Sequence, residues 1–159
     1  MTKKNLRCKV ISFPDFVLPF KTIECLALNI QLSRFKSFIL CLVYRPLFYL
    51  TTEDIDFFDR LISELHKYKQ DFYICGDLNI HFENTNDRQI KRFTNMLNRN
   101  NVFIITKEPT RNDARLDCFI SNDQEKITDD GVTNPHLSDH LCCFITRKCL
   151  IDKLNQKPS

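Results

Sequence analysis

The stretch Asp71-Phe72-Tyr73-Ile74-Cys75-Gly76-Asp77-Leu78-Asn79-Ile80-His81 decides the fold. Its aromatic and β-branched start predicts a short buried strand over 71–75. Gly76, one of only two glycines in the chain, lets the backbone turn or approach a ligand closely. If the chain stays extended past Gly76, Asp77 and Asn79 project to one side. A carboxylate beside an amide suits a charged, oxygen-rich ligand, and an Asx-rich turn that merely ends a strand is the alternative.

The rest of the chain supplies further strands and helices in a definite order. Alternation and apolar runs predict strands over 22–30, 37–44, 102–106, 116–121, 127–133 and 140–147. Helical spacing predicts one helix that begins after Thr51 and Thr52 and runs to about residue 68, and a second over about 88–100. Strands that first alternate with helices and then follow without them imply an α/β protein with a mixed sheet.

Polar side chains stand where these predicted strands begin or end. Strands 37–44 and 71–75, joined by a helix, are expected to be parallel, so both end at the same edge of the sheet. If strands 116–121 and 140–147 run antiparallel to them, their beginnings share that edge. Side chains of kinds used in catalysis would then gather there: Tyr44, Asp77, Asn79, Asp117, Asp139 and His140.

The bulk composition sets wide bounds on function. A chain of 159 residues, 43% hydrophobic and 27% charged, fits one globular domain. The net charge of +3 is too small to indicate nucleic acid by itself. Basic residues gather near both ends, where frayed, solvated termini are the simpler interpretation: Lys3, Lys4, Arg7 and Lys9, then Arg147, Lys148, Lys153 and Lys157.

Eight cysteines do not form a zinc or disulfide pattern, because none stands in a Cys-x-x-Cys pair or at Cys/His ligand spacing. Five lie in apolar, strand-like runs, as small hydrophobic residues do: Cys25, Cys41, Cys75, Cys118 and Cys142. Free cysteines fit a reducing compartment. No signal peptide opens the chain, and its apolar runs are too short to span a bilayer. We therefore expect an intracellular protein, nuclear or cytoplasmic, without a membrane partner.

Three motifs together resemble the endonuclease/exonuclease/phosphatase superfamily: Gly76-Asp77-Leu78-Asn79, Arg115-Leu116-Asp117-Cys118-Phe119 and Ser138-Asp139-His140. Tyr44-Arg45-Pro46 and Pro109-Thr110-Arg111 narrow the resemblance to the apurinic-type endonuclease domain of non-LTR retrotransposons. The resemblance covers residues 22–147, with 1–21 and 148–159 as flanking segments. It implies an incomplete four-layer α/β sandwich with a mixed β-sheet.

The resemblance also implies an activity, the cleavage of phosphoesters, here of DNA, with water and Mg²⁺ or Mn²⁺. Asp77 would handle the proton of the attacking water or of the leaving oxygen. Asn79 would orient the phosphate and Asp77. Tyr44 would hydrogen-bond the phosphate, although an aromatic residue at a strand end is equally often structural.

Asp117, His140 and Asp139 would complete the implied site. His140 would donate to a non-bridging phosphate oxygen as charge builds there, with Asp117 holding and charging its imidazole. Asp139 would lie in or next to the metal shell. Neighbouring residues of a regular strand face opposite ways, so Asp139 and His140 can both serve only if they lie in a turn before the strand, as Ser138 suggests. His81 and His136 are interpreted as loop residues, and Arg111 as a surface arginine.

The family pattern has an early segment with no counterpart here, including the glutamate that is its principal metal ligand. Glu24, in Ile23-Glu24-Cys25-Leu26, matches a later strand of the family. We therefore expect an N-terminally truncated domain with weaker metal binding and an exposed apolar sheet face. A missing N-terminal segment or a reverse transcriptase domain of the parent protein would be its partner. Two alternatives stay open, a catalytically inactive remnant of a mobile element and a phosphatase of the same superfamily.

Overall fold

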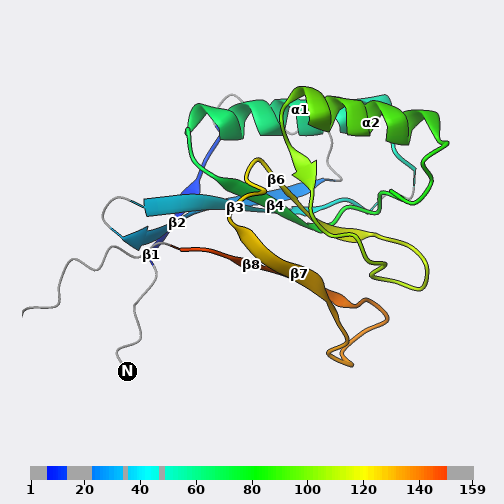
Figure 1. Cartoon of the computed structure of the whole chain (residues 1–159). Helices are drawn as coiled ribbons and strands as arrows, with labels where there is room; N and C mark the ends of the chain where they lie inside the picture. Colours follow the sequence, from blue (N-terminus) through cyan, green and yellow to red (C-terminus); the bar gives the residue numbers. More distant parts are fainter. Residues whose placement is uncertain (1–6, 14–22, 34–35, 47–48, 150–159) are drawn as a thin grey trace, which may run out of the picture.

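A computed structural model describes residues 7–13, 23–33, 36–46 and 49–149. Figure 1 shows two helices over one face of a large sheet and a small sheet on its other side. The helices are α1 (Thr52–Lys67) and α2 (Arg88–Arg99). The large sheet has the order β1-β2-β3-β4-β6-β5, and its strands are β1 (Arg7–Ile11), β2 (Glu24–Ser33), β3 (Lys36–Tyr44), β4 (Phe72–Asp77), β5 (Phe103–Ile104) and β6 (Asp117–Ser121). The small sheet pairs β7 (Ile127–Thr133) with β8 (Cys142–Arg147).

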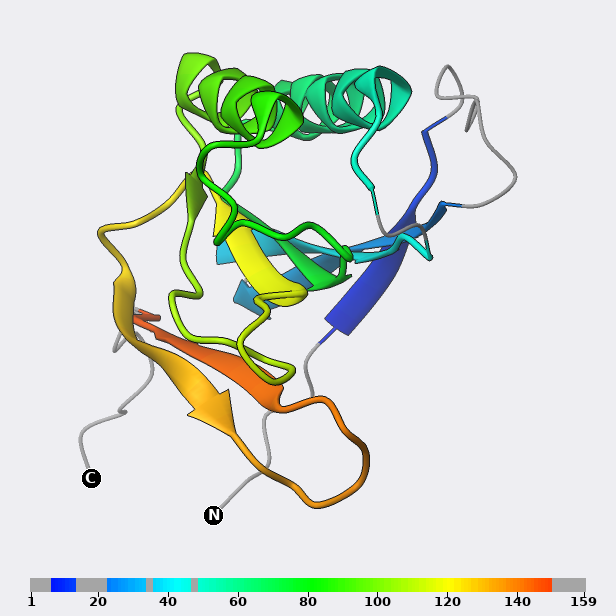
Figure 2. The ribbon, with the colours of Figure 1, turned by 90° about the vertical axis from the view of Figure 1, so that its right-hand side faces the viewer.

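The pairing of β3, β4 and β6 makes the large sheet mixed, as predicted. β3 and β4 are parallel, with Ile39 opposite Phe72. β6 runs antiparallel to β4, with Asp77 opposite Asp117. The helix layer, the large sheet and the small sheet stack as the predicted incomplete α/β sandwich (Figure 2).

The hydrophobic core lies between the helices and the large sheet. Alternate residues of β3, such as Ile39 and Cys41, are fully buried on this face. Phe58 of α1 meets Phe93 of α2 edge to face, with ring centroids 5.2 Å apart. The predicted capping of α1 is present, because Thr51 and Asp54 bond each other's backbone in a capping box. None of the helices in the described ranges is long and apolar enough to cross a membrane.

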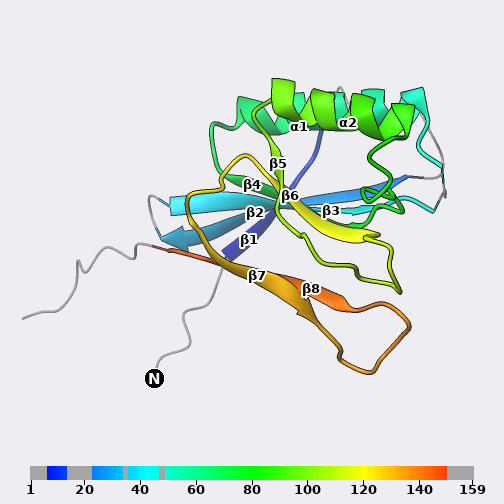
Figure 3. The same cartoon turned by 45° about the vertical axis from the view of Figure 1, so that its right-hand side comes forward.

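β8 differs from its prediction as the strand that closes the core. It belongs to the small sheet, and its residues alternate between exposed and half-buried because one side packs toward β6 and the other meets solvent (Figure 3). Cys142, expected to act as a small hydrophobic residue in a strand, does lie in β8, but it is exposed, whereas Cys143 is half-buried.

β1 was not predicted and adds an edge strand from within the segment expected to flank the domain. Its residues pair antiparallel with β2, with Val10 opposite Leu28. Arg7 and Lys9 therefore lie in a strand and not in a frayed terminus. Charged side chains are common on edge strands, so the basic character of this segment is compatible with that position. At the C-terminal end, the interpretation of Arg147 as part of a frayed, solvated terminus is also wrong. Its side chain is 13% exposed and pairs with Asp71 at 2.7 Å. The domain bounds 22–147 stay a prediction.

Some predictions fall on residues that the structure does not describe. They are the beginning of the strand expected over 22–30, the turn around 34–35, and the basic side chains Lys3, Lys4, Lys153 and Lys157.

One face of the large sheet carries exposed apolar side chains, as expected. The face opposite the helices is approached by β7 and β8 on the β4–β6 side, whereas β1, β2 and β3 present apolar residues to solvent. Their exposed fractions are 59% for Val10, 45% for Leu26, 52% for Leu42 and 45% for Tyr44.

Candidate active site

Two carboxylates face each other where β4 ends and β6 begins. Asp77 and Asp117 are direct partners in the antiparallel register, so their side chains lie on the same face of the sheet, away from the helices. Gly76 makes this geometry possible. It has φ +135°, and a Cβ at this position would stand 2.0 Å from the carbonyl oxygen of Val43. Any side chain at position 76 would therefore clash with β3, which explains why glycine stands there.

His140 reaches Asp117 from the segment that enters β8. Its Nδ1 lies 2.8 Å from Asp117 Oδ2, and the two side chains are 25% and 17% exposed. A carboxylate can only accept a hydrogen bond, so Nδ1 carries the hydrogen. Nε2 has no hydrogen-bond partner among the described residues and is free to meet a substrate oxygen.

Asp77, Asp117 and His140 form one cluster, because one ligand atom from each lies within 4.8 Å of the others. Burial raises the pKa of Asp77, and the nearby charge of Asp117 raises it further, whereas hydrogen bonds from Asn79 and the proximity of His140 act in the opposite direction. A raised pKa suits a carboxyl group that exchanges a proton during catalysis.

Asn79 supports Asp77 from the turn that follows β4. Its backbone N–H donates to Asp77 Oδ1 at 3.2 Å, and its side-chain amide donates to the carbonyl oxygen of Arg45 at 2.8 Å. It is 7% exposed and has φ +48°, a conformation that asparagine tolerates better than most residues. The alternation expected for an extended chain past Gly76 therefore ends at this turn.

No protein-family model and no curated protein sequence matches the chain, but solved structures resemble it. The endonuclease domain of TRAS1, a telomere-specific non-LTR retrotransposon, superposes with a TM-score of 0.67 at 18% identity, over 88% of this chain and 67% of that domain. The chain has the endonuclease/exonuclease/phosphatase fold. A protein of that family from Leptotrichia buccalis gives a TM-score of 0.60 at 16% identity, over 79% of this chain and 54% of the other. The human Nocturnin catalytic domain gives 0.50 at 15% identity, over 88% of this chain and 61% of that domain.

Tyr44 and Asp139 are the remaining predicted site residues at this edge of the sheet. Tyr44 ends β3 on the same sheet face as Asp77 and is 45% exposed. Asp139 precedes His140 in a turn, as expected, yet its carboxylate pairs with Arg111 Nη2 at 2.7 Å. Its side chain is 66% exposed, and its carboxylate is not part of the group of ligand atoms that Asp77, Asp117 and His140 form among the described residues.

Arg45 is a site-building residue that sequence reasoning missed. It is fully buried, and its guanidinium donates to the carbonyl oxygens of Leu78 and Asn79, both at 2.7 Å. It also pairs with Asp54 at 3.2 Å, next to the start of α1. Two signals were available: Arg45 directly follows a nearly continuous apolar strand, and it belongs to the quoted motif Tyr44-Arg45-Pro46, for which no structural role was assigned to the arginine.

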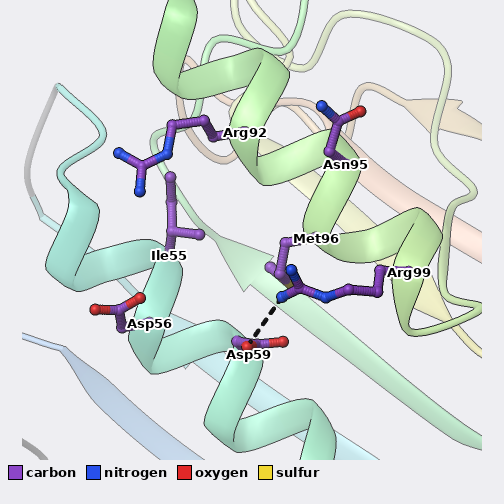
Figure 4. A pocket seen from close by; sticks show the side chains of 7 residues that line it. All are labelled: Ile55, Asp56, Asp59, Arg92, Asn95, Met96 and Arg99. Atoms are coloured by element: carbon purple, nitrogen blue, oxygen red, sulfur yellow. Dashed lines mark hydrogen bonds and ion pairs between the residues drawn. The ribbon is translucent and has the colours of Figure 1, made fainter.

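Two surface hollows among the described residues are lined by residues other than Asp77, Asp117 and His140. One of about 280 Å³ lies between α1 and α2, where Arg99 pairs with Asp59 at 3.2 Å (Figure 4). Another, of about 220 Å³, runs from Asn79 past His81 to the start of α2. His81 pairs with Glu83 at 2.6 Å and stays a loop residue, as predicted.

Proposed function

We propose that this chain is a metal-dependent phosphodiester hydrolase that nicks DNA, with Asp77, Asp117 and His140 at its centre. The observation that carries the proposal is the convergence of these three side chains from β4, β6 and the segment before β8. The structural likeness to a retrotransposon endonuclease domain supports DNA as the substrate class. A nuclear or cytoplasmic location fits that substrate, and the likeness to a retrotransposon endonuclease domain is the reason to propose a reverse transcriptase domain as partner.

The donor set fits a divalent cation. Mg²⁺ and Mn²⁺ prefer oxygen ligands, and Mg²⁺ keeps several waters when few carboxylates bind it. Asp77 and the carboxylate oxygen of Asp117 that does not bond His140 would hold the ion, with Asp139 joining if its pair with Arg111 opens. When bound, the ion would offset the negative charge of the substrate phosphate.

The side chains themselves would perform the proton transfers and orient the phosphate. Asp117 holds the imidazole of His140 through Nδ1–H, so that in its charged form, with a second hydrogen on Nε2, the ring donates to a phosphate oxygen on which charge builds. Asp77, whose pKa is raised by burial and by Asp117, accepts a proton from the attacking water or returns one to the leaving oxygen. Asn79 keeps the carboxylate of Asp77 in place through its backbone N–H.

Nicking of supercoiled plasmid in the presence of Mg²⁺ or Mn²⁺ tests the proposal. We expect Asp77→Ala and His140→Ala each to slow nicking by about a hundredfold or more, the usual scale of general acid–base catalysis. His81→Ala is the matched control, because His81 is also a partly exposed histidine paired with a carboxylate, but outside the cluster.

Three results would contradict the proposal. They are a wild-type chain that does not nick, nicking that is unchanged in the Asp77→Ala/His140→Ala double variant, or an equal loss in His81→Ala. Hydrolysis of an inositol phosphate without plasmid nicking would replace the endonuclease by a phosphatase. No hydrolysis of either substrate would favour an inactive remnant.

A further inference from the structure

Thr110 lies beside the cluster, in the loop between β5 and β6, and is fully buried. Its hydroxyl oxygen accepts the backbone N–H of Leu116 at 3.1 Å and that of Asp117 at 3.0 Å. Its carbonyl oxygen accepts the N–H of Leu141 at 2.6 Å, and its own N–H donates to Ala114 at 2.9 Å. One buried residue therefore bonds backbone groups of four others.

These positions lead directly to the two members of the Asp117–His140 pair. Asp117 receives the hydroxyl contact through its own N–H, and Leu141 follows His140 in the chain. Asp117 belongs to the large sheet, whereas His140 and Leu141 lead into the small sheet. Thr110 thus joins the two sheets at the point where the carboxylate and the imidazole meet.

We infer that Thr110 is a positioning residue, which holds Asp117 and His140 at hydrogen-bond distance and so keeps the hydrogen of His140 on Nδ1. A threonine hydroxyl has two acceptor lone pairs, and the two N–H groups use both. Valine has nearly the same shape but offers no acceptor, so two backbone donors at the start of β6 would lose their partner. The expected loss of catalysis in Thr110→Val rests on the proposed function, whereas the expected change in the position of the His140 hydrogen does not.

Thr106 provides a matched control on the same loop. It is 1% exposed, and its hydroxyl accepts the N–H of Phe119 at 3.0 Å. Phe119 lies on β6 two residues beyond Asp117, so Thr106 supports the same strand without bonding the backbone of Asp117 or His140. Thr106→Val therefore reports the general cost of removing a buried hydroxyl from this loop.

The experiment measures the tautomer of the neutral His140 ring by nitrogen NMR of the imidazole, on the full chain without metal or substrate, at a pH high enough that the histidines are uncharged. The signals of the four histidines are distinguished by the loss of one set in His140→Gln. We expect the Nδ1–H form in the wild type, Thr106→Val and Thr110→Ser, because serine keeps the hydroxyl. In Thr110→Val we expect a large share of the Nε2–H form, which an unpartnered imidazole prefers.

If Thr110→Val does not fold, Thr110→Cys replaces it, since a thiol is a weak acceptor of similar size, and a partial shift toward Nε2–H is expected. The inference is overturned if Thr110→Val or its replacement keeps the Nδ1–H form, if Thr110→Ser loses it, or if Thr106→Val shifts it equally. In the nicking assay we expect kcat to fall about tenfold or more in Thr110→Val with little change in KM, and to recover in Thr110→Ser. An inactive wild type with the expected tautomers would contradict the proposed function and leave this inference standing.

Discussion

Asp77 can stand opposite Asp117 because the preceding residue has no side chain. Any Cβ at position 76 would overlap the carbonyl oxygen of Val43, and the backbone conformation there is one that only glycine adopts readily. The geometry of the Asp77–Asp117 pair thus depends on Gly76, a residue that has no functional group of its own.

We expect Gly76→Ala to lower the free energy of unfolding by about 3 kcal/mol or more, or to prevent folding, because both the overlap and the backbone strain oppose it. Gly131→Ala is the control, since the nearest atom to its Cβ would be in the ring of Phe144 at 3.2 Å, and a small movement of that side chain would relieve the contact. Urea unfolding curves of the two variants measure the difference. Equal losses in both would contradict the steric explanation.

The residues of the cluster could be predicted from sequence because each stands at a strand end. Periodicity predicts the strands that carry Asp77 and Asp117. Their meeting depended on strand 116–121 running antiparallel to strand 71–75, as the structure shows for β6 and β4. The bond between Asp139 and Arg111 could not be predicted, because side-chain directions in a turn depend on contacts that no local pattern encodes. The structural roles of Arg45 and Thr110 could not be predicted for a related reason. Both are buried polar residues whose hydrogen-bond partners include residues distant in the sequence.

The carboxylate of Glu83 joins the loop after β4 to the segment that enters β6. Glu83 accepts hydrogen bonds from His81 Nδ1 at 2.6 Å and from the N–H of Arg115 at 3.3 Å. Partial burial alone would raise the pKa of Glu83, but its hydrogen bonds with its own backbone, with His81 and with Arg115 outweigh burial and lower it. Folding therefore favours the charged form of this glutamate.

Because the pKa of Glu83 is lower in the folded chain than in the unfolded one, its contribution to stability is present above the unfolded value and lost as pH falls through the folded value. We expect Glu83→Gln to lower the thermal unfolding midpoint at pH 7. The difference from wild type should shrink toward the lowest pH at which both chains fold. Glu64→Gln, which removes a surface pair with Lys67, should change little at either pH. A gap for Glu83→Gln that does not change with pH would refute the linkage.

The elements differ in how far the sequence reveals them. Both helices and the strands β2, β3, β4 and β6 carry clear apolar periodicity, and the structure contains them close to the predicted bounds. β1 lacks that signal, because four of its five residues are exposed and the fifth is half-buried. β8 was recognised as a strand, but its pairing with β7 in a separate sheet depends on non-local contacts.

At the scale of the whole molecule, the face of the large sheet opposite the helices is apolar and open over β1, β2 and β3. Leu26 and Leu42 are direct cross-strand partners on this face and are about half exposed. Adjacent exposed apolar side chains of this kind mark association surfaces more often than isolated ones do.

We expect the chain to self-associate as its concentration rises, and a Leu26→Gln/Leu42→Gln variant to stay monomeric at higher concentration. Leu137→Gln is the control, because Leu137 is 86% exposed but stands alone on a loop. Sedimentation velocity over a concentration series distinguishes them. Association that persists in the double variant, or is abolished equally by the control, would place the contact elsewhere.

The buried guanidinium of Arg45 ties the first turn of α1 to the turn that carries Asn79. Neither segment can open while the other stays closed without leaving buried carbonyls or a buried charge unpartnered. Amide hydrogen exchange should therefore report one shared opening energy for Ile55, Leu78 and Asn79, and Arg45→Lys, which cannot reproduce the forked contacts, should accelerate exchange at all three together. The sheet edge that carries Asp77 and Asn79 and the start of α1 would then form a single cooperative unit, so that a substitution in the first turn of α1 would also loosen this edge.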